Sequence, residues 1–267
     1  MGALSTALSR TGTYRAYARE ALHAARCTVW YPLGFLEASL GTGEPVGDVR
    51  RDTPVILVHG YGHNRSGWLV LERHLRRSGF TSVHTLNYLP VFNDVAALAE
   101  QLARRVDEVR ALTGHDKVHL VCHSLGGVLA RWYVQELDGD HHVDTAITVA
   151  TPHEGTQAAR VPLGRAVNDL RPGSAVIRRL ATGARPTTVR WIALYSNVDA
   201  FVLPASSAQI RSPELGAQNV LIRDHAHISI MVSRPVAETI ASLLQVEPLQ
   251  RRDGVAPPPR DATATPA

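Results

Sequence analysis

A serine stands at an abrupt break in the apolar pattern of the chain, within the stretch KVHLVCHSLGG at residues 117–127. A short apolar run ends just before Ser124, and apolar residues then recur at helical spacing from 128 to 137. A tight strand-to-helix turn of this kind forces the serine hydroxyl out of the sheet, where it can act as a nucleophile. Gly126 supplies a small residue that this turn needs, whereas Cys122 replaces the usual glycine, so the motif is C-x-S-x-G. Without its flanking residues, Ser124 would be interpreted as a helix N-cap.

A nucleophilic serine also needs hydrogen-bond donors for the oxygen on which negative charge develops. The apolar run at residues 55–58 is followed directly by His59, Gly60 and Tyr61. Gly60 permits the unusual backbone conformation that would aim the Tyr61 N–H at this oxygen, and the Leu125 N–H would be the second donor. The alternative is a plain glycine turn. The presence of Ser124 favours the oxyanion loop.

An acid and a base are expected after later strands, in the chain order serine, acid, histidine. Asp199 follows the strand-like run at residues 189–195, where a strand-end acid should stand. After the next such run come Asp224, His225 and His227, and either histidine has a suitable position. We favour His227 as the base because it lies further into the loop, just ahead of the last helix. Asp224 is the competing acid, but immediate neighbours in a chain seldom point at one another.

Other reactive side chains have simpler explanations. His59 and His63 lie on a glycine loop without a nearby carboxylate, and we expect no metal there. The DGDHH stretch at residues 138–142 lies in a turn and is interpreted as a solvated loop. Residues 151–156 follow a strand and should shape a pocket wall. Cys122 belongs to a strand, so its thiol should be buried and inert.

Apolar runs and helical patterns alternate along the chain. Strands are predicted at residues 55–58, 83–88, 118–121, 143–150, 189–195 and 220–222, with the main helices at 68–77, 94–112, 128–137 and 235–244. This alternation predicts an α/β fold with a mostly parallel central sheet and helices on both faces. Residues 151–187 lose the periodicity and are predicted to be loops with short helices. We expect one domain at residues 53–247, an N-terminal helical extension at 1–52 packed on it, and a disordered tail at 248–267.

Charge and composition narrow the class of protein. The net charge is +4, but four arginines and one glutamate lie within the first 26 residues, so the rest is nearly neutral and nucleic-acid binding is not expected. The absence of a signal-peptide pattern favours a cytoplasmic protein, with membrane association or secretion after processing as alternatives. A helix predicted at residues 14–26 would dock its alanine-rich face on the domain, or would lie on an anionic membrane through its arginines. We expect a monomer.

With these residues assembled, the chain resembles the small bacterial triacylglycerol lipases and esterases of the α/β-hydrolase superfamily. The stretches that carry the resemblance are VILVHGYGHN, VHLVCHSLGGVLARWYV, VATPHEGT, IALYSNVDAFVLP and DHAHISIMVSRPV, across residues 53 to 245. The resemblance implies a triad of Ser124, Asp199 and His227, oxyanion donors at Tyr61 and Leu125, a small or minimal lid, and ester hydrolysis without a cofactor.

The expected substrate is an acyl ester, lipid-like or of medium chain length, with peripheral contact to a lipid surface as a further expectation. Residues expected to form the substrate pocket are His59, Gly60, Val91, Phe92, His123, Pro152, Phe201, Val202 and Ile228. The fold alone does not fix the substrate, so phospholipase, thioesterase and acyltransferase activities remain alternatives on the same triad. A non-catalytic lipid-binding protein and a membrane-docking module driven by residues 14–36 are the alternatives outside this chemistry.

Overall fold

The structure is a computed structural model. It describes residues 18, 20–22, 25, 29, 31–34, 53–161 and 163–245. The predicted tail at 248–267 lies outside the described residues. So does most of the N-terminal extension predicted at 1–52. Within the described part of the chain, no helix is both long enough and apolar enough to cross a membrane.

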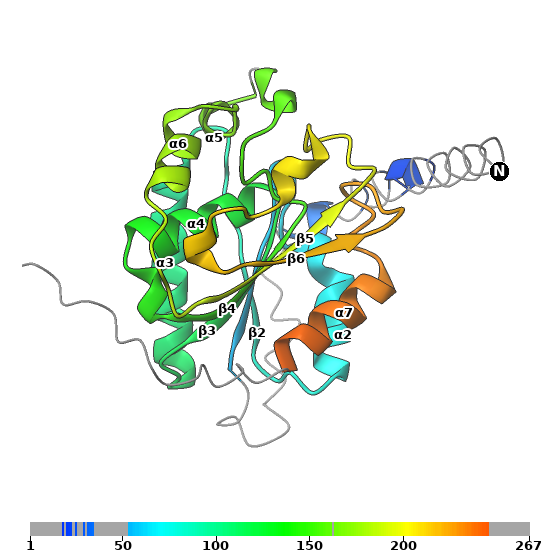
Figure 1. The fold of residues 1–267 in the computed structure, drawn as a ribbon. Coiled ribbons are helices and arrows are strands. Elements are labelled where there is room, and N and C mark those ends of the chain that lie inside the picture. The colour runs from blue at the N-terminus through cyan, green and yellow to red at the C-terminus, as the bar shows by residue number, and fades with distance from the viewer. Residues whose placement is uncertain are drawn as a thin grey trace, which may run out of the picture.

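A parallel β-sheet forms the centre of the molecule (Figure 1). Its six strands in the described part of the chain are β1 (Val55–Val58), β2 (Val83–Leu86), β3 (Val118–His123), β4 (Val143–Val149), β5 (Arg190–Ser196) and β6 (Gln218–Ile222). Their order across the sheet is β2-β1-β3-β4-β5-β6, and every neighbouring pair is parallel. The carboxyl ends of β3, β4 and β5 therefore meet at one edge, where open α/β sheets bind their ligands.

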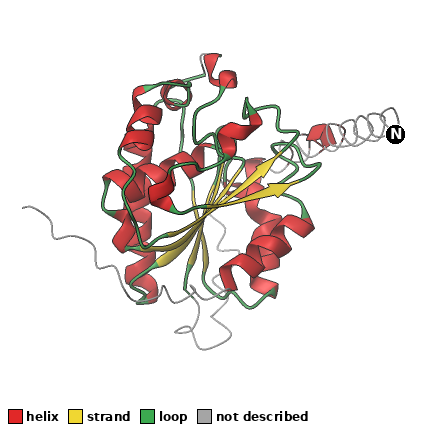
Figure 2. Ribbon diagram, in the orientation of Figure 1, coloured by secondary structure: helices red, strands yellow, loops and turns green. Residues whose placement is uncertain are grey.

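Helices cover both faces of this sheet (Figure 2). Helices α2 (Leu69–Arg77) and α7 (Arg234–Gln245) pack together on one face, and α3 (Val95–Thr113) and α4 (Leu125–Glu136) pack together on the other (Figure 1). Each face has its own apolar core. The strands β1 and β3 are buried along their whole length because they contribute side chains to both cores. The sequence prediction of an α/β fold with helices on both faces is confirmed.

Local sequence signals explain where the helices begin and end. Asp94 precedes α3 and accepts a hydrogen bond from the Ala97 N–H at 2.9 Å, as an N-cap does. Gly114 ends the helix in the left-handed conformation, at a φ of 69°. The apolar stripe of α3 at Val95, Leu98, Leu102, Val106 and Val109 is completely buried. The helix predicted at residues 94–112 is confirmed.

Strand β2 ends at Leu86, two residues before its predicted end at Tyr88. The side chains of the next two residues, Asn87 and Tyr88, form hydrogen bonds with the segment that follows β1. The Asn87 side chain accepts a hydrogen bond from the Arg65 N–H at 2.8 Å. The Tyr88 hydroxyl donates to the His59 carbonyl at 2.5 Å. These contacts compete with continued strand pairing.

The connection between β4 and β5 contains short helices, as predicted. These are η4 (Gln157–Arg160), α5 (Arg165–Asp169) and α6 (Ala175–Thr182). Arg131 of α4 links this connection to the helix, because its guanidinium donates hydrogen bonds to the carbonyls of Leu180 and His153 at 2.7 and 3.3 Å. Burial lowers the pKa of Arg131 only to about 10, so it stays charged at neutral pH.

The N-terminal helix contacts the domain differently from the sequence prediction. Its described residues at 18, 20–22 and 25 are helical, as expected. The alanine-rich face was predicted to dock, but Ala18, Ala21, Leu22 and Ala25 are all exposed. Among these described residues, Glu20 contacts the domain through polar hydrogen bonds to the segment after β6.

Candidate active site

Ser124 occupies a sharp turn between β3 and α4. Its φ of 52° and ψ of −120° lie in a region that L-residues seldom adopt, which is typical of a strained functional position. The Ser124 N–H donates to the Val149 carbonyl of the neighbouring strand at 2.9 Å and so fixes the turn to the sheet edge. A Cβ atom at Gly126 would lie 2.5 Å from the Val58 carbonyl oxygen, so only glycine allows α4 to approach β1 this closely. The local geometry matches the strand-turn-helix predicted for the C-x-S-x-G motif.

The imidazole of His227 lies between Ser124 and Asp199. Its Nε2 is 3.1 Å from the Ser124 Oγ, and its Nδ1 is 2.8 Å from the Asp199 Oδ2. A carboxylate only accepts hydrogen bonds, so Nδ1 carries the proton and Nε2 is free to accept the serine proton. The structure thus brings together three residues that the sequence analysis selected from three separate strand ends.

Asp199 is held by its own loop. Its second oxygen, Oδ1, accepts hydrogen bonds from the N–H groups of Phe201 and Val202 at 2.8 and 2.9 Å. The residue is 6% exposed, so the carboxylate has little access to water and its partners define its orientation. Hydrogen bonds to a charged acceptor are stronger than neutral ones and fix the oxygen facing His227.

The competing residues point elsewhere. The His225 Nε2 pairs with the Ser233 Oγ at 2.8 Å, and its Nδ1 pairs with the Arg223 carbonyl at 2.8 Å. Asp224 is exposed and lies in a turn with a φ of 58°, and its N–H donates to the Asn197 side chain. The geometry therefore places His227, and not His225, against Ser124.

His123, directly before the nucleophile, supports the main chain of His227. Its Nε2 donates to the His227 carbonyl oxygen at 3.0 Å, and the two rings lie 4.6 Å apart. Sequence reasoning placed His123 in the substrate pocket and missed this contact. It is 1% exposed and therefore lies behind the site. The signal available in the sequence was a histidine adjacent to the nucleophile, at the carboxyl end of a buried strand.

Three further histidines, His59, His63 and His123, are neutral at pH 7. Burial lowers the pKa of His59 and of His63 to about 4 in each case, with the nearby His227 contributing at His63. Burial also lowers the pKa of His123 well below its ordinary value, followed by the effect of His227. An imidazolium that forms on His227 therefore has neutral rings beside it, and the Asp199 carboxylate is its partner.

The loop after β1 lies against the nucleophile. A Cβ atom at Gly60 would be 2.9 Å from the Ser124 Cβ and 2.8 Å from the His123 Nδ1, so this position needs glycine. His59 supports this loop through packing. It is completely buried, and its ring stacks on the Tyr88 ring with centroids 4.2 Å apart. Tyr61 follows next in the chain.

Leu125, the second expected donor, is the first residue of α4. The first N–H groups of a helix have no acceptor within the helix and are available to an anion. The N–H groups of Tyr61 and Leu125 thus belong to two segments that adjoin Ser124, the loop of Gly60 and the start of α4. Their role as oxyanion donors remains a proposal.

Several large apolar side chains on the loops after β2, β4 and β5 are exposed to solvent. We name this set the apolar rim; it consists of Leu89 (58% exposed), Val91 (44%), Phe92 (78%), Val161 (55%), Leu163 (50%), Phe201 (51%) and Leu203 (41%). The Phe201 ring lies 5.1 Å from the His227 ring, and the Tyr61 hydroxyl donates to the Leu163 carbonyl. The rim therefore adjoins both the base and the loop after β1.

The remaining residues of the expected pocket differ in accessibility. Ile228 is half-buried, whereas Pro152 and Val202 are buried. Val202 is 0% exposed, and its N–H contacts Asp199, so it supports the acid from behind. Val91, Phe92 and Phe201 of the expected pocket are members of the apolar rim.

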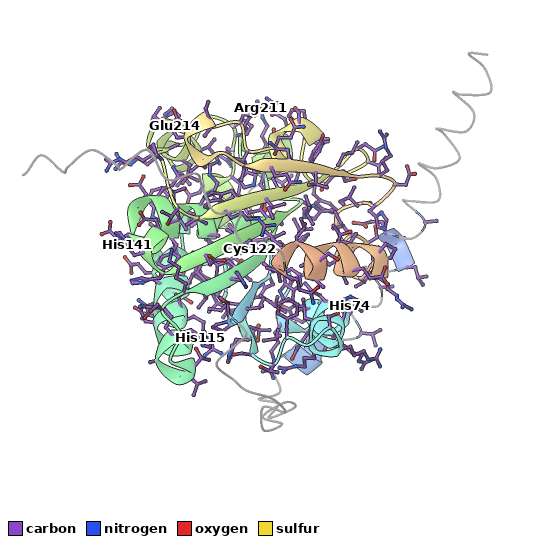
Figure 3. The ribbon with its side chains drawn as sticks, turned by 60° about the horizontal axis from the view of Figure 1, so that its bottom comes forward. His74, His115, Cys122, His141, Arg211 and Glu214 are labelled. Atoms are coloured by element: carbon purple, nitrogen blue, oxygen red, sulfur yellow. The ribbon has the colours of Figure 1, made fainter. Side chains whose placement is uncertain are left out.

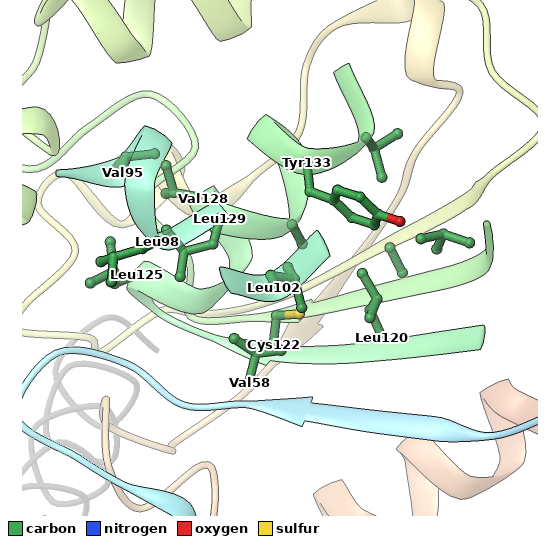
Figure 4. Close-up of a cluster of buried hydrophobic side chains, with 14 of the residues drawn as sticks. Val58, Val95, Leu98, Leu102, Leu120, Cys122, Leu125, Val128, Leu129 and Tyr133 are labelled. Atoms are coloured by element: carbon green, nitrogen blue, oxygen red, sulfur yellow. The ribbon is translucent and has the colours of Figure 1, made fainter. Parts of the chain in front are cut away.

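The alternative reactive groups lie away from this arrangement. Cys122 is at the centre of the sheet, and its sulfur packs beside Val58 and Leu102 (Figures 3 and 4). Burial strongly raises the pKa of its thiol, which keeps it protonated. His141 of the 138–142 stretch lies at the edge of the molecule in Figure 3. Among the described residues, no three His, Cys, Asp or Glu side chains converge in a way that would hold a metal ion.

Parts of this chain are similar to known proteins. The family model for the alpha/beta hydrolase fold matches residues 53–171. The chain is 33% identical over 114 residues to a triacylglycerol lipase of Pseudarthrobacter phenanthrenivorans, a match that covers 40% of this chain and 35% of that protein. It is 26% identical over 106 residues to a lysosomal thioesterase of Xenopus laevis, covering 38% of this chain and 36% of that protein. The matches thus span about a third of the length of these curated relatives.

A solved structure shows the same architecture. The mature lipase of Bacillus licheniformis superposes with a TM-score of 0.63 at 21% identity, covering 73% of this chain and 93% of that chain. The sheet, the turn at Ser124 and these matches together show the α/β-hydrolase fold, the fold implied by the resemblance found in the sequence. The sequence relatives and the solved structure named here are lipases and a thioesterase.

Proposed function

We propose that this protein is a serine ester hydrolase of the lipase and carboxylesterase type, acting through an acyl-enzyme on Ser124. The observation that carries the proposal is the continuous pair of contacts from the Ser124 Oγ to His227 at 3.1 Å and from His227 to Asp199 at 2.8 Å. This is the geometry of an activated serine, in which a base takes the hydroxyl proton and an acid orients the base.

In the first half of the reaction, the Ser124 Oγ attacks the ester carbonyl carbon while its proton passes to the His227 Nε2. The carbonyl oxygen gains the negative charge and is stabilised by the N–H groups of Tyr61 and Leu125. When the tetrahedral intermediate collapses, the bond to the leaving oxygen breaks, and His227 gives its proton to the departing alcohol. Asp199 holds the imidazolium in place throughout this step.

In the second half, water replaces the alcohol. The His227 Nε2 takes a proton from the water, whose oxygen attacks the acyl carbon. Collapse of this second intermediate breaks the bond to the Ser124 Oγ, which regains a proton from His227. The products of this half are a carboxylic acid and the free enzyme, and the proposed reaction uses no cofactor.

The apolar rim supports an acyl ester with a hydrophobic chain as the substrate. An acyl chain of medium length that contacts Phe201 would bury apolar surface near the base, at about 25 cal/mol for each Å² removed from water. The exposure of Phe92 at 78% and Phe201 at 51% leaves these side chains open to such a contact. The same rim would favour peripheral contact with a lipid surface.

Thioester hydrolysis is the second candidate, favoured by the similarity to the Xenopus laevis thioesterase. The same residues would serve, because the attack on a thioester carbonyl needs the same nucleophile and oxyanion donors. Phospholipase and acyltransferase activities would also use this triad, with a phospholipid as substrate or an alcohol in place of water. The remaining alternative is a lipid-binding protein that contacts acyl chains through the apolar rim and catalyses no reaction.

A chain-length series separates these candidates. Wild type, Ser124→Ala and His225→Ala would be assayed with aryl esters whose acyl chains contain two to sixteen carbons. The same variants would be assayed with triglyceride emulsions, phospholipid vesicles and acyl thioesters. We expect turnover of medium-chain esters by wild type and His225→Ala, and none by Ser124→Ala. Faster turnover of thioesters than of matched oxygen esters would favour the thioesterase. Binding of these lipids without turnover, or undiminished activity of Ser124→Ala, would contradict the proposal.

A further inference from the structure

The segment that carries His227 is a single helical turn after β6. The Ile230 N–H donates to the Ala226 carbonyl at 3.1 Å, which closes one turn, and the Met231 N–H donates to the Ile228 carbonyl at 3.1 Å. The first N–H groups of such a turn have no partner within it. In this turn they include those of Ile228 and Ser229, the two residues directly after the base.

Glu20 accepts hydrogen bonds from both of these N–H groups. Its Oε1 lies 2.7 Å from the Ile228 N, and its Oε2 lies 2.8 Å from the Ser229 N. One carboxylate thus holds two consecutive backbone groups, 208 and 209 positions away in the chain. The side chain is half-buried, and hydrogen bonds to an ionised acceptor are about twice as strong as neutral ones.

Glu20 is also unusual in its own segment. It is the only acidic residue among the first 26, against four arginines. Among the described residues of this helix, the alanine and leucine side chains at 18, 21, 22 and 25 are exposed, and Glu20 makes the hydrogen bonds to the His227 turn. The helix is therefore attached to the domain at the turn that carries the base.

We propose that Glu20 is a positioning residue for His227, so that the N-terminal helix helps to set the geometry of the catalytic base. The His123 Nε2 fixes the carbonyl of His227 from the sheet side at 3.0 Å, and Glu20 fixes the two following amides from the outer side. The imidazole between these two anchors must lie within hydrogen-bond distance of both Ser124 and Asp199. A displacement of about 1 Å at such a base can lower the rate by about 100-fold.

The inference rests on the proposed ester hydrolase function, and its test has a readout that does not depend on activity. Hydrogen–deuterium exchange would be measured at single-residue resolution in wild type and Glu20→Ala. We expect faster exchange at the amides of Ile228 and Ser229 in the variant, and unchanged exchange at Ile230, whose amide bonds to Ala226. Equal exchange at all three amides in the two proteins would overturn the contact, whatever the protein catalyses.

The kinetic test compares Glu20→Ala, Glu20→Gln and Glu20→Asp with Glu100→Gln, which changes an exposed carboxylate on α3. We expect kcat to fall about 10- to 100-fold in Glu20→Ala with little change in KM, because the rim remains intact. In Glu20→Gln, which keeps one acceptor oxygen, kcat should fall less than in Glu20→Ala. Glu20→Asp should likewise retain part of the wild-type kcat. The kcat of Glu100→Gln should equal that of wild type.

A rise in KM alone, or an unchanged kcat in Glu20→Ala, would overturn the positioning role while the proposed function stands. If wild type itself hydrolyses none of the esters, the proposed function fails, and with it the catalytic role of Glu20. The exchange experiment then still decides whether the carboxylate holds the turn. A loss of folded protein in Glu20→Ala is checked by thermal unfolding, with Glu20→Gln as the more conservative variant for the same comparison.

Discussion

The His227 Nε2 lies 3.1 Å from the Ser124 Oγ, although the two residues are 103 positions apart in the chain. Ser124 follows β3, while His227 follows β6, which lies at the edge of the sheet beyond β4 and β5. The loop after β6 therefore has to cross the carboxyl ends of the intervening strands. Asp199 lies on the loop after β5 and meets the imidazole along this path at 2.8 Å.

This relationship predicts strongly non-additive effects of mutation. Ser124→Ala and His227→Ala should each lower kcat/KM by about 10⁴-fold or more, and the double variant should be little worse than either. Asp199→Asn should lower kcat by about 10³- to 10⁴-fold, because an amide no longer selects the required tautomer of His227. Steady-state kinetics on one aryl ester measures all four variants. Multiplicative losses in the double variant would contradict a shared role.

The oxyanion donors can be tested by a pair of substitutions at one position. Tyr61→Pro removes the backbone N–H and should lower kcat by about 10²- to 10³-fold. Tyr61→Phe keeps the N–H and removes only the hydroxyl that bonds to the Leu163 carbonyl, so kcat should stay close to wild type. Circular dichroism and thermal unfolding establish that both variants are folded. Equal kcat values in the two folded variants would show that Tyr61 donates no catalytic hydrogen bond.

Acid should destabilise the protein through histidines that are buried as neutral rings. Burial lowers the pKa of His59 from its ordinary value of 6.5 to about 4. Between these values the unfolded chain binds a proton at His59 that the folded chain does not, so this stability is complete above pH 6.5 and is lost as the pH falls toward 4. One such group lowers the free energy of unfolding by about 2 kcal/mol between pH 7 and pH 5.

Urea unfolding at pH 7, 6 and 5 measures this effect. His59→Asn should show a shallower loss of stability with falling pH than wild type, even if it is less stable at pH 7. His141→Asn, which changes an exposed residue, should follow the wild-type slope. An identical slope in His59→Asn and wild type would contradict the assignment of this acid sensitivity to His59.

Cys122 should be a packing residue without a chemical role. In a Cys27→Ser background, thiol reagents should label Cys122 only when the protein unfolds, because the side chain is 1% exposed. Cys122→Ala should lower the free energy of unfolding by about 1 to 2 kcal/mol through the cavity that it leaves, and kcat should be retained. Rapid labelling of the folded protein, or a loss of kcat in folded Cys122→Ala, would contradict this interpretation.

The sequence was sufficient for the sheet and for the strand ends that carry the site. A continuous apolar run such as residues 55–58 marks a strand that is covered on both faces, and this pattern does not depend on distant contacts. The turn at Ser124 was predictable because strand and helix periodicities meet there. Asp199 was predictable for a similar reason, since it directly follows a clear strand.

Other features depend on the folded backbone and could not be derived from residue patterns. His225 and His227 share one loop, and the choice between them follows from the turn at Ala226–Ile230 and the bond from His225 to Ser233. The contact of Glu20 involves backbone N–H groups, which any residue provides, so no side-chain pattern marks its partner. The exposed alanines of the same helix show that amphipathic spacing does not by itself determine which face makes the contact.

Covalent labelling of the nucleophile tests the proposed function most directly. Wild type, Ser124→Ala and His227→Ala would be treated with an alkyl phosphonate ester that carries an aryl leaving group, and the proteolytic peptides would be analysed by mass spectrometry. We expect one phosphonyl group on Ser124 in wild type, none in Ser124→Ala, and labelling slowed by about 10³-fold or more in His227→Ala. Wild type that stays unlabelled, or a label on another residue that persists in Ser124→Ala, would contradict Ser124 as the nucleophile.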